Sequence, residues 1–489
     1  MAHLRPGIAL LAIVAALIAV PSVLAAEKTK PPNILLILAD DLGYGDPGCF
    51  NAKSKIKTPN FDGLARDGMR FTDAHAPGAV CVPSRYGLLT GRYPFRNQGN
   101  RNPTKGALIE KDRVTVASLL RGKGYTTAML GKWHQGFEGG DAFAYDKVLR
   151  GGPVDHGFES FFGQHASLDI PPYFFIENDR CVEAATKTIT ANSTPGWSPI
   201  QGAFWREGAL APNFKHADVM PTYTRKAVDF LERRGNSTDD KPFFLYFACT
   251  APHTPWLPRQ AFQEKSKAGL YGDFVEDLDD AIGQVLTALK RAGLADNTLV
   301  IFTSDNGPVW YPADVEKYGH SANGIWRGMK GDAWEGGHRM PFIARWPGKI
   351  QANTVCDETI CFTDLLATFA ALVGTDLPAD AGEDSYNLLP LLRSEKHDKP
   401  LREATVMESS RGVLTIRQGE WKLIPKLGSG GFSKPAEEKP KEGEPAGQLY
   451  NLADDPSETK NLYADKPDIV KRLAALLEQY QKKGRSVPR

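Results

Sequence analysis

Three apolar runs in the chain each end in a cluster of polar residues. They cover residues 33–39 (NILLILA), 243–248 (FFLYFA) and 299–302 (LVIF). Unbroken runs of this length predict strands that are buried on both faces, as in a parallel sheet covered by helices. Sites in such sheets form at the carboxyl ends of the strands, so we expect the polar clusters to lie close together. In chain order, these clusters are Asp40-Asp41, Pro252-His253 and Ser304-Asp305-Asn306-Gly307.

A helix is predicted directly before the third run. Apolar residues recur at helical spacing between positions 275 and 289, and Gly293 and Asn297 then interrupt the pattern. Strands that alternate with helices in this way indicate one α/β domain with long inserted loops. We assign residues 27–384 to this domain.

The pattern changes from residue 385 onward. Short strands are predicted at 412–416, 421–424 and 448–450, and apolar residues between 469 and 480 mark a closing amphipathic helix. Residues 428–446 are rich in Gly, Lys, Glu and Pro, which predicts a flexible surface segment. We therefore expect a small α+β subdomain over residues 385–489.

The first 26 residues have the pattern of a secretory signal peptide. Arg5 precedes an apolar run at 8–20, and a stretch of small residues ends at Ala25-Ala26. A run of this length is short for a bilayer span, so we expect no stable membrane span, with an uncleaved anchor as the alternative. The prediction is an exported protein, periplasmic or secreted.

Composition excludes some classes of protein without indicating a function. The chain has 489 residues, of which 42% are hydrophobic and 24% charged, as in an ordinary globular protein. Its net charge of +1 gives no support for a nucleic-acid partner. Six cysteines in so long a chain do not form a disulfide scaffold, although Cys356 and Cys361 are a candidate pair.

Two of the polar clusters offer ligands for a hard cation. Asp40-Asp41 alone fits a helix cap or a turn, and Asp305-Asn306 alone fits a turn. Together they supply up to four oxygen ligands from two strand ends. Oxygen ligands suit Ca²⁺ or Mg²⁺, whereas softer metals recruit His or Cys.

The segment from Cys81 to Gly91, CVPSRYGLLTG, carries the strongest motif. It resembles the type I sulfatase motif C-x-P-S-R-x-x-x-L-T-G at every fixed position. Other blocks resemble the same family in the same order along the chain, and the resemblance covers nearly all of the mature chain. These blocks are DDLGYGD at 40–46, GKWH at 131–134, SDNG at 304–307, GMKGDAWEGG at 328–337 and LYNLADDP at 449–456, followed by Glu458 and Asn461-Leu462.

The resemblance implies an alkaline-phosphatase-like fold with an antiparallel sheet in the C-terminal subdomain. It also implies that a separate formylglycine-generating enzyme oxidises Cys81 to formylglycine, whose hydrate carries two hydroxyl groups. One hydroxyl attacks sulfur, and loss of the proton from the other expels sulfate; a single serine hydroxyl would stall at a stable sulfate ester.

The resemblance further implies a role for each motif residue. Asp40, Asp41, Asp305 and Asn306 would hold the cation, usually Ca²⁺ with Mg²⁺ as the alternative, and residue 81 would complete its coordination. Lys132 and Lys330 would contact sulfate oxygens, Arg85 would orient the formylglycine, His134 would hydrogen-bond the hydrate, His253 would protonate the leaving oxygen, and Ser167 would lie near the sulfate. Four histidines stay outside this centre: His156, His165, His320 and His338.

The nature of the substrate is less specified than the chemistry. Aromatic residues in segments 135–220 and 308–326 suggest stacking on sugar rings, with anchoring of loops as the alternative. We therefore expect a sulfated small molecule or glycan. There are two competing interpretations. One is a phosphate or phosphonate monoester hydrolase of the same superfamily, and the other is a carbohydrate-binding protein with a disabled site. The aromatic residues are Tyr173, Phe174, Phe175, Trp197, Trp205, Trp310 and Trp326.

Overall fold

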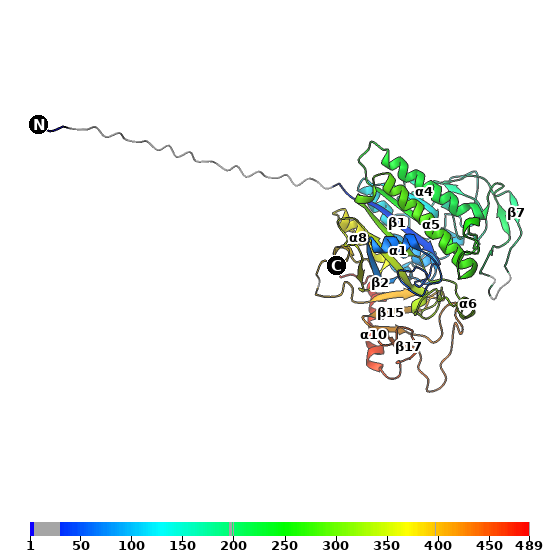
Figure 1. Ribbon diagram of the computed structural model, residues 1–489. Helices are drawn as coiled ribbons and strands as arrows, with labels where there is room; N and C mark the ends of the chain where they lie inside the picture. Colours follow the sequence, from blue (N-terminus) through cyan, green and yellow to red (C-terminus); the bar gives the residue numbers. More distant parts are fainter. Residues whose placement is uncertain (4–29, 195–197, 199, 397, 489) are drawn as a thin grey trace. The chain divides into compact units, whose positions relative to one another are not determined.

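The three apolar runs form the centre of one large sheet in the computed structural model (Figure 1). The structure describes residues 1–3, 30–194, 198, 200–396 and 398–488. Within them, residues 32–489 form one compact unit, and residues 1–31 are a separate unit. Residues 4–26 of the predicted signal peptide and Trp197 lie outside the described residues. Among the helices that the structure describes, none has the length and apolar character needed to cross a bilayer.

The large sheet has eleven strands in the described part of the chain, and its core is parallel. Strand β1 pairs in parallel with β9 and β10, and β3 pairs in parallel with β9 and β4. In spatial order, the strands are β12 (Thr354–Cys356), β2 (Met69–His75), β11 (Arg339–Arg345), β10 (Thr298–Ser304), β1 (Asn33–Asp40), β9 (Phe243–Pro252), β3 (Thr126–Lys132), β4 (Ser160–Gln164), β5 (Ile176–Glu177) and β6 (Arg180–Cys181), with β13 (Ile360–Cys361) also paired to β2.

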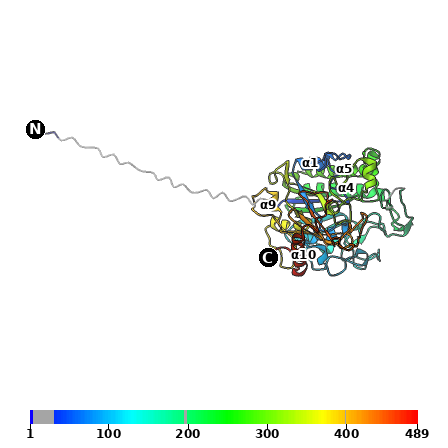
Figure 2. The same cartoon turned by 90° about the horizontal axis from the view of Figure 1, so that it is seen from below.

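Helices cover both faces of this sheet, as neighbouring residues of β9 show. Phe243 packs on Phe230 of α4, whereas Phe244 packs on Phe369 of α8. Successive strand residues point to opposite faces, so α4 and α8 lie on opposite sides. Helices α1 and α5 lie with α4 (Figure 2), and α2 and α3 pack with α8. The helices are α1 (Pro59–Arg66), α2 (Cys81–Thr90), α3 (Val116–Gly122), α4 (Val219–Gly235), α5 (Gly269–Arg291), α6 (Pro312–Tyr318), α7 (Glu335–His338), α8 (Leu365–Leu372), α9 (Leu389–Leu392) and α10 (Pro467–Lys483).

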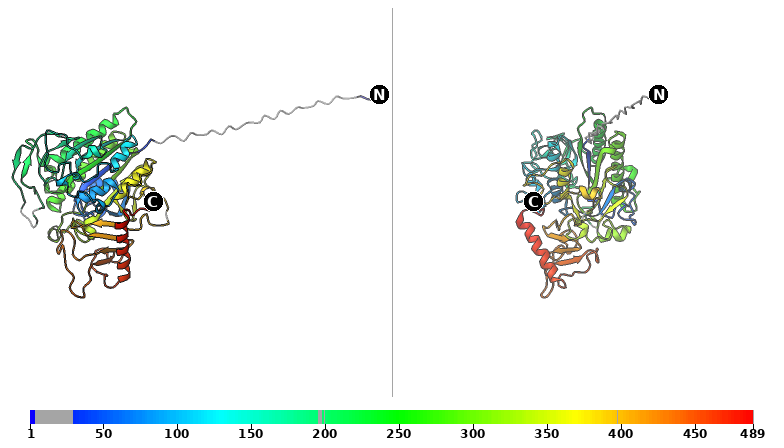
Figure 3. Two further views of the ribbon diagram at one scale, coloured as in Figure 1. Left: turned by 180° about the vertical axis from the view of Figure 1, so that it is seen from behind. Right: turned by 90° about the vertical axis from the view of Figure 1, so that its left-hand side faces the viewer.

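A second, antiparallel sheet of four strands lies near the C-terminus. It consists of β14 (Thr405–Glu408), β15 (Leu414–Gln418), β16 (Trp421–Ile424) and β17 (Gln448–Asn451). Leucines of α10 pack on its apolar face, and the helix runs across the direction of the strands (Figures 1 and 3). A two-stranded sheet of β7 (Lys187–Ile189) and β8 (Gly208–Leu210) belongs to the insertion before α4. The predicted α/β fold with a small antiparallel sheet is confirmed.

Two local expectations are corrected by the structure. The segment 428–446 is not a surface segment throughout, because residues 428–431 are buried, whereas 434–435, 437–444 and 446 are exposed. Its buried part packs against residues 331–333, where Ala333 N donates to Ser429 O at 2.7 Å. All six cysteines are free thiols, including the candidate pair Cys356 and Cys361.

Candidate active site

The ends of β1, β9 and β10 meet at one edge of the large sheet. The register places Ala39 beside Ser304 and Asp40 beside Pro252, so Asp41, His253 and Asp305 emerge side by side. The backbone N–H of Asp41 donates to Asp305 Oδ1 at 3.2 Å. The expectation that these polar clusters converge, drawn from the apolar runs alone, is confirmed.

Strand β3 brings Lys132 to the same edge because two glycines permit close packing there. Gly131 has φ 114°, and a Cβ on it would lie 1.8 Å from Ala248 O of β9. A Cβ on Gly163 of β4 would lie 1.8 Å from Gly131 O. Larger residues would push the strands apart and displace the lysine that follows.

Cys81 is the first residue of α2, and Arg85 lies one turn later in the same helix. Both side chains are buried. The Arg85 guanidinium pairs with Asp305 Oδ2 at 2.8 Å and donates to Lys132 O at 2.9 Å, so it ties three elements together. The amino end of a helix carries partial positive charge, which favours an anion beside Cys81. Burial raises the pKa of the Cys81 thiol, although Lys132 and Lys330 oppose that shift.

Two buried lysines each pair with one of the adjacent aspartates. Lys132 Nζ lies 2.6 Å from Asp40 Oδ2, and Lys330 Nζ lies 2.6 and 2.8 Å from the two Asp41 oxygens. Burial would raise the pKa of Asp40, but Lys132 and its other cationic neighbours lower it overall. The Asp40 carboxylate is therefore ionised at neutral pH.

The oxygen atoms at this edge fit a divalent cation. Asp40 Oδ1 and Asn306 Oδ1 are buried and have no hydrogen-bond partner among the described residues. Burial and the negative charge of Asp40 raise the pKa of Asp305, which is the repulsion that a cation would relieve. Asp41 has φ 66°, a left-handed conformation that holds its carboxylate beside Asp40 and Asp305. Carboxylate and amide oxygens without a thiolate suit Ca²⁺ or Mg²⁺.

The two predicted histidines lie at the same site in different environments. Burial lowers the pKa of His134 well below its usual range, and Lys132 and Arg85 lower it further, so its imidazole is neutral. Its Nδ1 has no partner among the described residues. His253 Nδ1 donates to Thr254 O at 2.7 Å, which turns Nε2 toward Asp41, 3.6 Å away.

Ser167 stands apart from these contacts. Its hydroxyl is buried and has no hydrogen-bond partner in the part of the chain that the structure describes, so no hydrogen bond of this hydroxyl links it to the other candidates. Asp169, two residues later, was missed by the sequence reasoning although its carboxylate lies 3.9 Å from His253 Nδ1. No motif marks Asp169, since its proximity arises from the fold of the insertion between β4 and α4.

Most of the aromatic residues of the inserted segments anchor loops. Tyr173, Phe174 and Trp310 are buried, and Trp310 donates through Nε1 to His320 O at 2.9 Å. Trp205 stacks on His216, and Trp326 packs under Arg339. Stacking on a sugar ring is therefore the wrong interpretation for Tyr173, Phe174 and Trp310.

Comparisons with known proteins agree with this geometry. A family described as Sulfatase matches residues 32–375. An N-acetylgalactosamine-6-O-sulfatase of Bacteroides thetaiotaomicron is 35% identical, over 92% of this chain and 93% of its own. Human arylsulfatase A is 34% identical, over 92% of this chain and 87% of its own. A solved structure from a study of glycosaminoglycan metabolism by Bacteroides thetaiotaomicron superposes with a TM-score of 0.82 at 32% identity, covering 93% of this chain and all of that one.

The fold and these relatives define the class of protein, a sulfuric ester hydrolase with an alkaline-phosphatase-like fold. The chain belongs to the sulfatase family. Because the matched relatives are named as sulfatases, the competing interpretation of a phosphate or phosphonate ester hydrolase loses its support.

Proposed function

We propose that the protein hydrolyses sulfate esters of carbohydrates, with residue 81 as nucleophile after oxidation of its thiol to formylglycine. The observation that carries this proposal is the position of Cys81, buried at the start of α2 and within electrostatic reach of the ammonium groups of Lys132 and Lys330. Four oxygen-bearing side chains lie at the same edge: Asp40, Asp41, Asp305 and Asn306.

The chain's own cations would bind the anionic ester. Lys132 and Lys330 reach the site from different elements, and both are buried, so their charge is poorly screened by water. Arg85, held by Asp305, would fix the orientation of residue 81. A bound divalent cation, which we propose to be Ca²⁺, would add Lewis-acid stabilisation of charge on a sulfate oxygen.

The two histidines would divide the proton transfers. Neutral His134 would accept a hydrogen bond from the hydrated residue 81 and take the proton whose loss expels sulfate. His253 donates through Nδ1 to Thr254 O, so it would act in its doubly protonated form and give the proton on Nε2 to the leaving oxygen. Ser167 would lie near the bound sulfate.

The substrate class and the cellular setting complete the proposal. A relative that covers 92% of this chain is named for a sulfated amino sugar, which supports a sulfated glycan as substrate. The signal-peptide pattern at 1–26 supports export to the periplasm or beyond, with maturation by a formylglycine-generating enzyme. The mature chain would comprise a catalytic domain over 27–384 and a subdomain over 385–489.

The modification at residue 81 is the direct test. Trypsin is expected to release residues 71–85 as one peptide from protein made in its native host. Formylglycine would appear as replacement of the sulfur and two hydrogens by one oxygen in that peptide, measured by mass spectrometry. An unmodified, alkylatable thiol at Cys81 in fully active protein would overturn the proposed mechanism.

Replacing His253 by alanine is expected to slow the hydrolysis of esters with poor leaving groups more than that of esters with good ones. A sugar alkoxide needs a proton as the S–O bond breaks, so kcat on a sulfated sugar should fall by about 10²–10⁴-fold. A 4-nitrophenolate leaves without protonation, and its sulfate ester should lose less than about 10-fold. Parallel kinetics with both esters provide the measurement. Equal losses on the two esters would assign His253 a role other than general acid.

A further inference from the structure

The loop that carries Lys330, residues 327–335, is held on one side by the catalytic site. Lys330 N donates to Pro308 O at 2.9 Å, just after the Asp305-Asn306 cluster. Gly331 N donates to Ala79 O at 2.7 Å, two residues before Cys81. We call this segment the lysine loop.

The other side of the lysine loop is held by the C-terminal part of the chain. Ser410 N donates to Gly331 O at 2.9 Å, and Ala333 N donates to Ser429 O at 2.7 Å. Ser433 N donates to the Asp332 carboxylate at 3.0 Å. Residues that precede β15 and residues that follow β16 in the chain therefore hold the lysine loop.

Glu458 joins the two ends of the lysine loop. Its backbone oxygen accepts from Arg327 at 2.6 Å, where the loop begins, and its Oε2 accepts from Glu335 N at 2.7 Å, where the loop ends at α7. Glu458 is fully buried and has φ 50°, a left-handed conformation that non-glycine residues adopt rarely. A buried acid in a strained conformation requires strong local support.

That support comes from the ammonium group of Lys422 in β16. It lies 2.9 Å from Glu458 Oε1, 3.0 Å from Glu335 Oε1 and 3.1 Å from His338 Nε2. Lys422 is fully buried, so these three partners replace its hydration. Removing one member of such a buried group leaves the others uncompensated.

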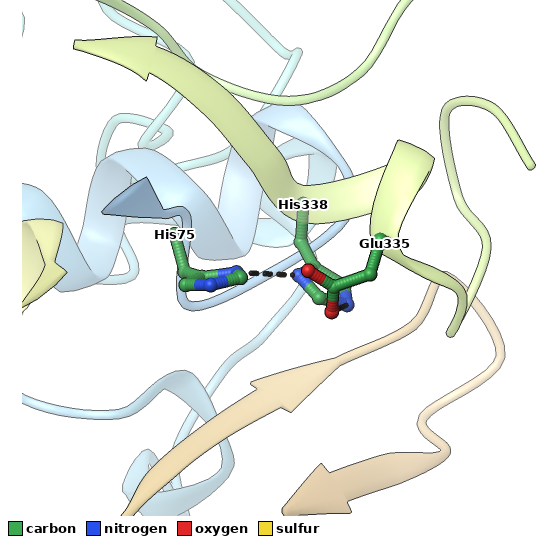
Figure 4. Close-up of side chains that lie close together, drawn as sticks. All are labelled: His75, Glu335 and His338. Carbon is green, nitrogen blue, oxygen red and sulfur yellow. Dashed lines mark hydrogen bonds and ion pairs between the residues drawn. The ribbon is translucent and has the colours of Figure 1, made fainter. Parts of the chain in front are cut away.

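The neighbouring cluster of His75, Glu335 and His338 has the composition of a metal site (Figure 4). However, Lys422 already supplies a cation to Glu335 and His338, and Arg339 Nε lies 2.9 Å from Glu335 Oε2. A divalent ion there would face both of these cations at close range. The cluster is better explained as a built-in ion-pair network.

Close polar contacts extend the network toward the large sheet. Lys422 Nζ lies 3.1 Å from His338 Nε2, and the Nδ1 atoms of His338 and His75 lie 3.0 Å apart (Figure 4). His75 Nε2 lies 2.7 Å from Asp73 Oδ1. Burial lowers the pKa of both histidines, in agreement with two neutral rings. The network thereby connects β16 to β2 of the large sheet.

We propose that Lys422 and Glu458, both in the C-terminal part of the chain, are positioning residues for Lys330. They act through Glu335 and the lysine loop, and they fix where the Lys330 ammonium meets the sulfate. The kinetic part of this inference rests on the proposed function, since it assumes that Lys330 binds the sulfate ester.

A double-mutant cycle tests the inference. Lys422→Met is expected to lower kcat/KM by about 10²-fold in the otherwise unchanged enzyme, because small misplacement of a charged group has effects of this size. In a Lys330→Ala background, the same change should lower kcat/KM by less than about 3-fold, since the group it positions is gone. Lys426→Met, at an exposed lysine four residues later, is the matched control and should leave kcat/KM unchanged in both backgrounds. Equal losses in both backgrounds would overturn the inference.

Hydrogen exchange provides a readout that does not depend on turnover. Lys422→Met should speed amide exchange in a peptide covering residues 328–335, relative to peptides of β1 and β9. Glu458→Gln keeps an acceptor for Glu335 N but removes the charge, and it replaces Lys422→Met if that variant fails to fold. Unchanged exchange over 328–335 in a folded variant would refute the positioning role. If the wild-type protein does not hydrolyse sulfate esters but the variant still exchanges faster over 328–335, only the proposed function is refuted.

Discussion

Replacing Cys81 by serine is expected to abolish multiple turnover, with a loss on the order of 10⁴-fold or more, while leaving the first chemical step in place. A serine hydroxyl at the start of α2 would still lie near Lys132 and Lys330 and would be able to attack sulfur. It has no second hydroxyl whose deprotonation could expel sulfate. The variant should therefore stop as a sulfate ester of its own serine.

The trapped ester is measurable after one exposure to an aryl sulfate. Intact mass should rise by one sulfuryl group, and the tryptic peptide 71–85 should carry it. Release of 4-nitrophenol should show a single stoichiometric burst with no steady state. Cys181→Ser, at a half-buried cysteine in β6, is the matched control and should turn over normally. Sustained turnover by Cys81→Ser would contradict the requirement for two oxygens on one carbon.

The central strands were predictable because their surroundings accept only apolar side chains. Strands β1, β9 and β10 are buried on both faces, so polar residues are excluded until the strand ends. Strand β2 gave no such signal, since it carries Asp73 and His75 in buried positions. Those residues are tolerated because Arg417 and Arg339 pair with Asp73 from distant parts of the chain.

Some residues of the candidate site were likewise predictable from the strand pattern, and others were not. The rule that sites form at the ends of parallel strands brought Asp40, Asp41, Asp305 and His253 together without any family argument. Lys330 was predictable only from the resemblance to the sulfatase family, because its loop does not follow the end of a strand. Lys422 lies 92 positions further along the chain, and no local pattern links the two. Such contacts depend on packing between two sheets, which sequence spacing does not encode.

Replacing Asp41 by asparagine is expected to remove most of the activity and most of the protein's response to Ca²⁺. Asparagine tolerates the left-handed conformation at φ 66°, so the backbone of this position should be retained. The change removes the negative charge that pairs with Lys330 and that we assign to the metal. We expect kcat/KM to fall by about 10³-fold, in line with the loss of a charge that organises the reaction centre.

Calcium titration separates this effect from a general loss of stability. A ligand that binds only the folded state raises Tm with its concentration, so Tm of the chelator-treated wild type should rise as Ca²⁺ is added back, along with activity. In Asp41→Asn the Tm rise should shrink strongly, whereas Asp67→Asn, at an exposed carboxylate after α1, should respond as the wild type does. A full Tm response with lost activity would place Asp41 outside the metal site and leave its contact with Lys330 as the cause. Activity that survives complete chelation would remove the divalent cation from the mechanism, because the two lysines and Arg85 would then suffice to balance the charge of the ester.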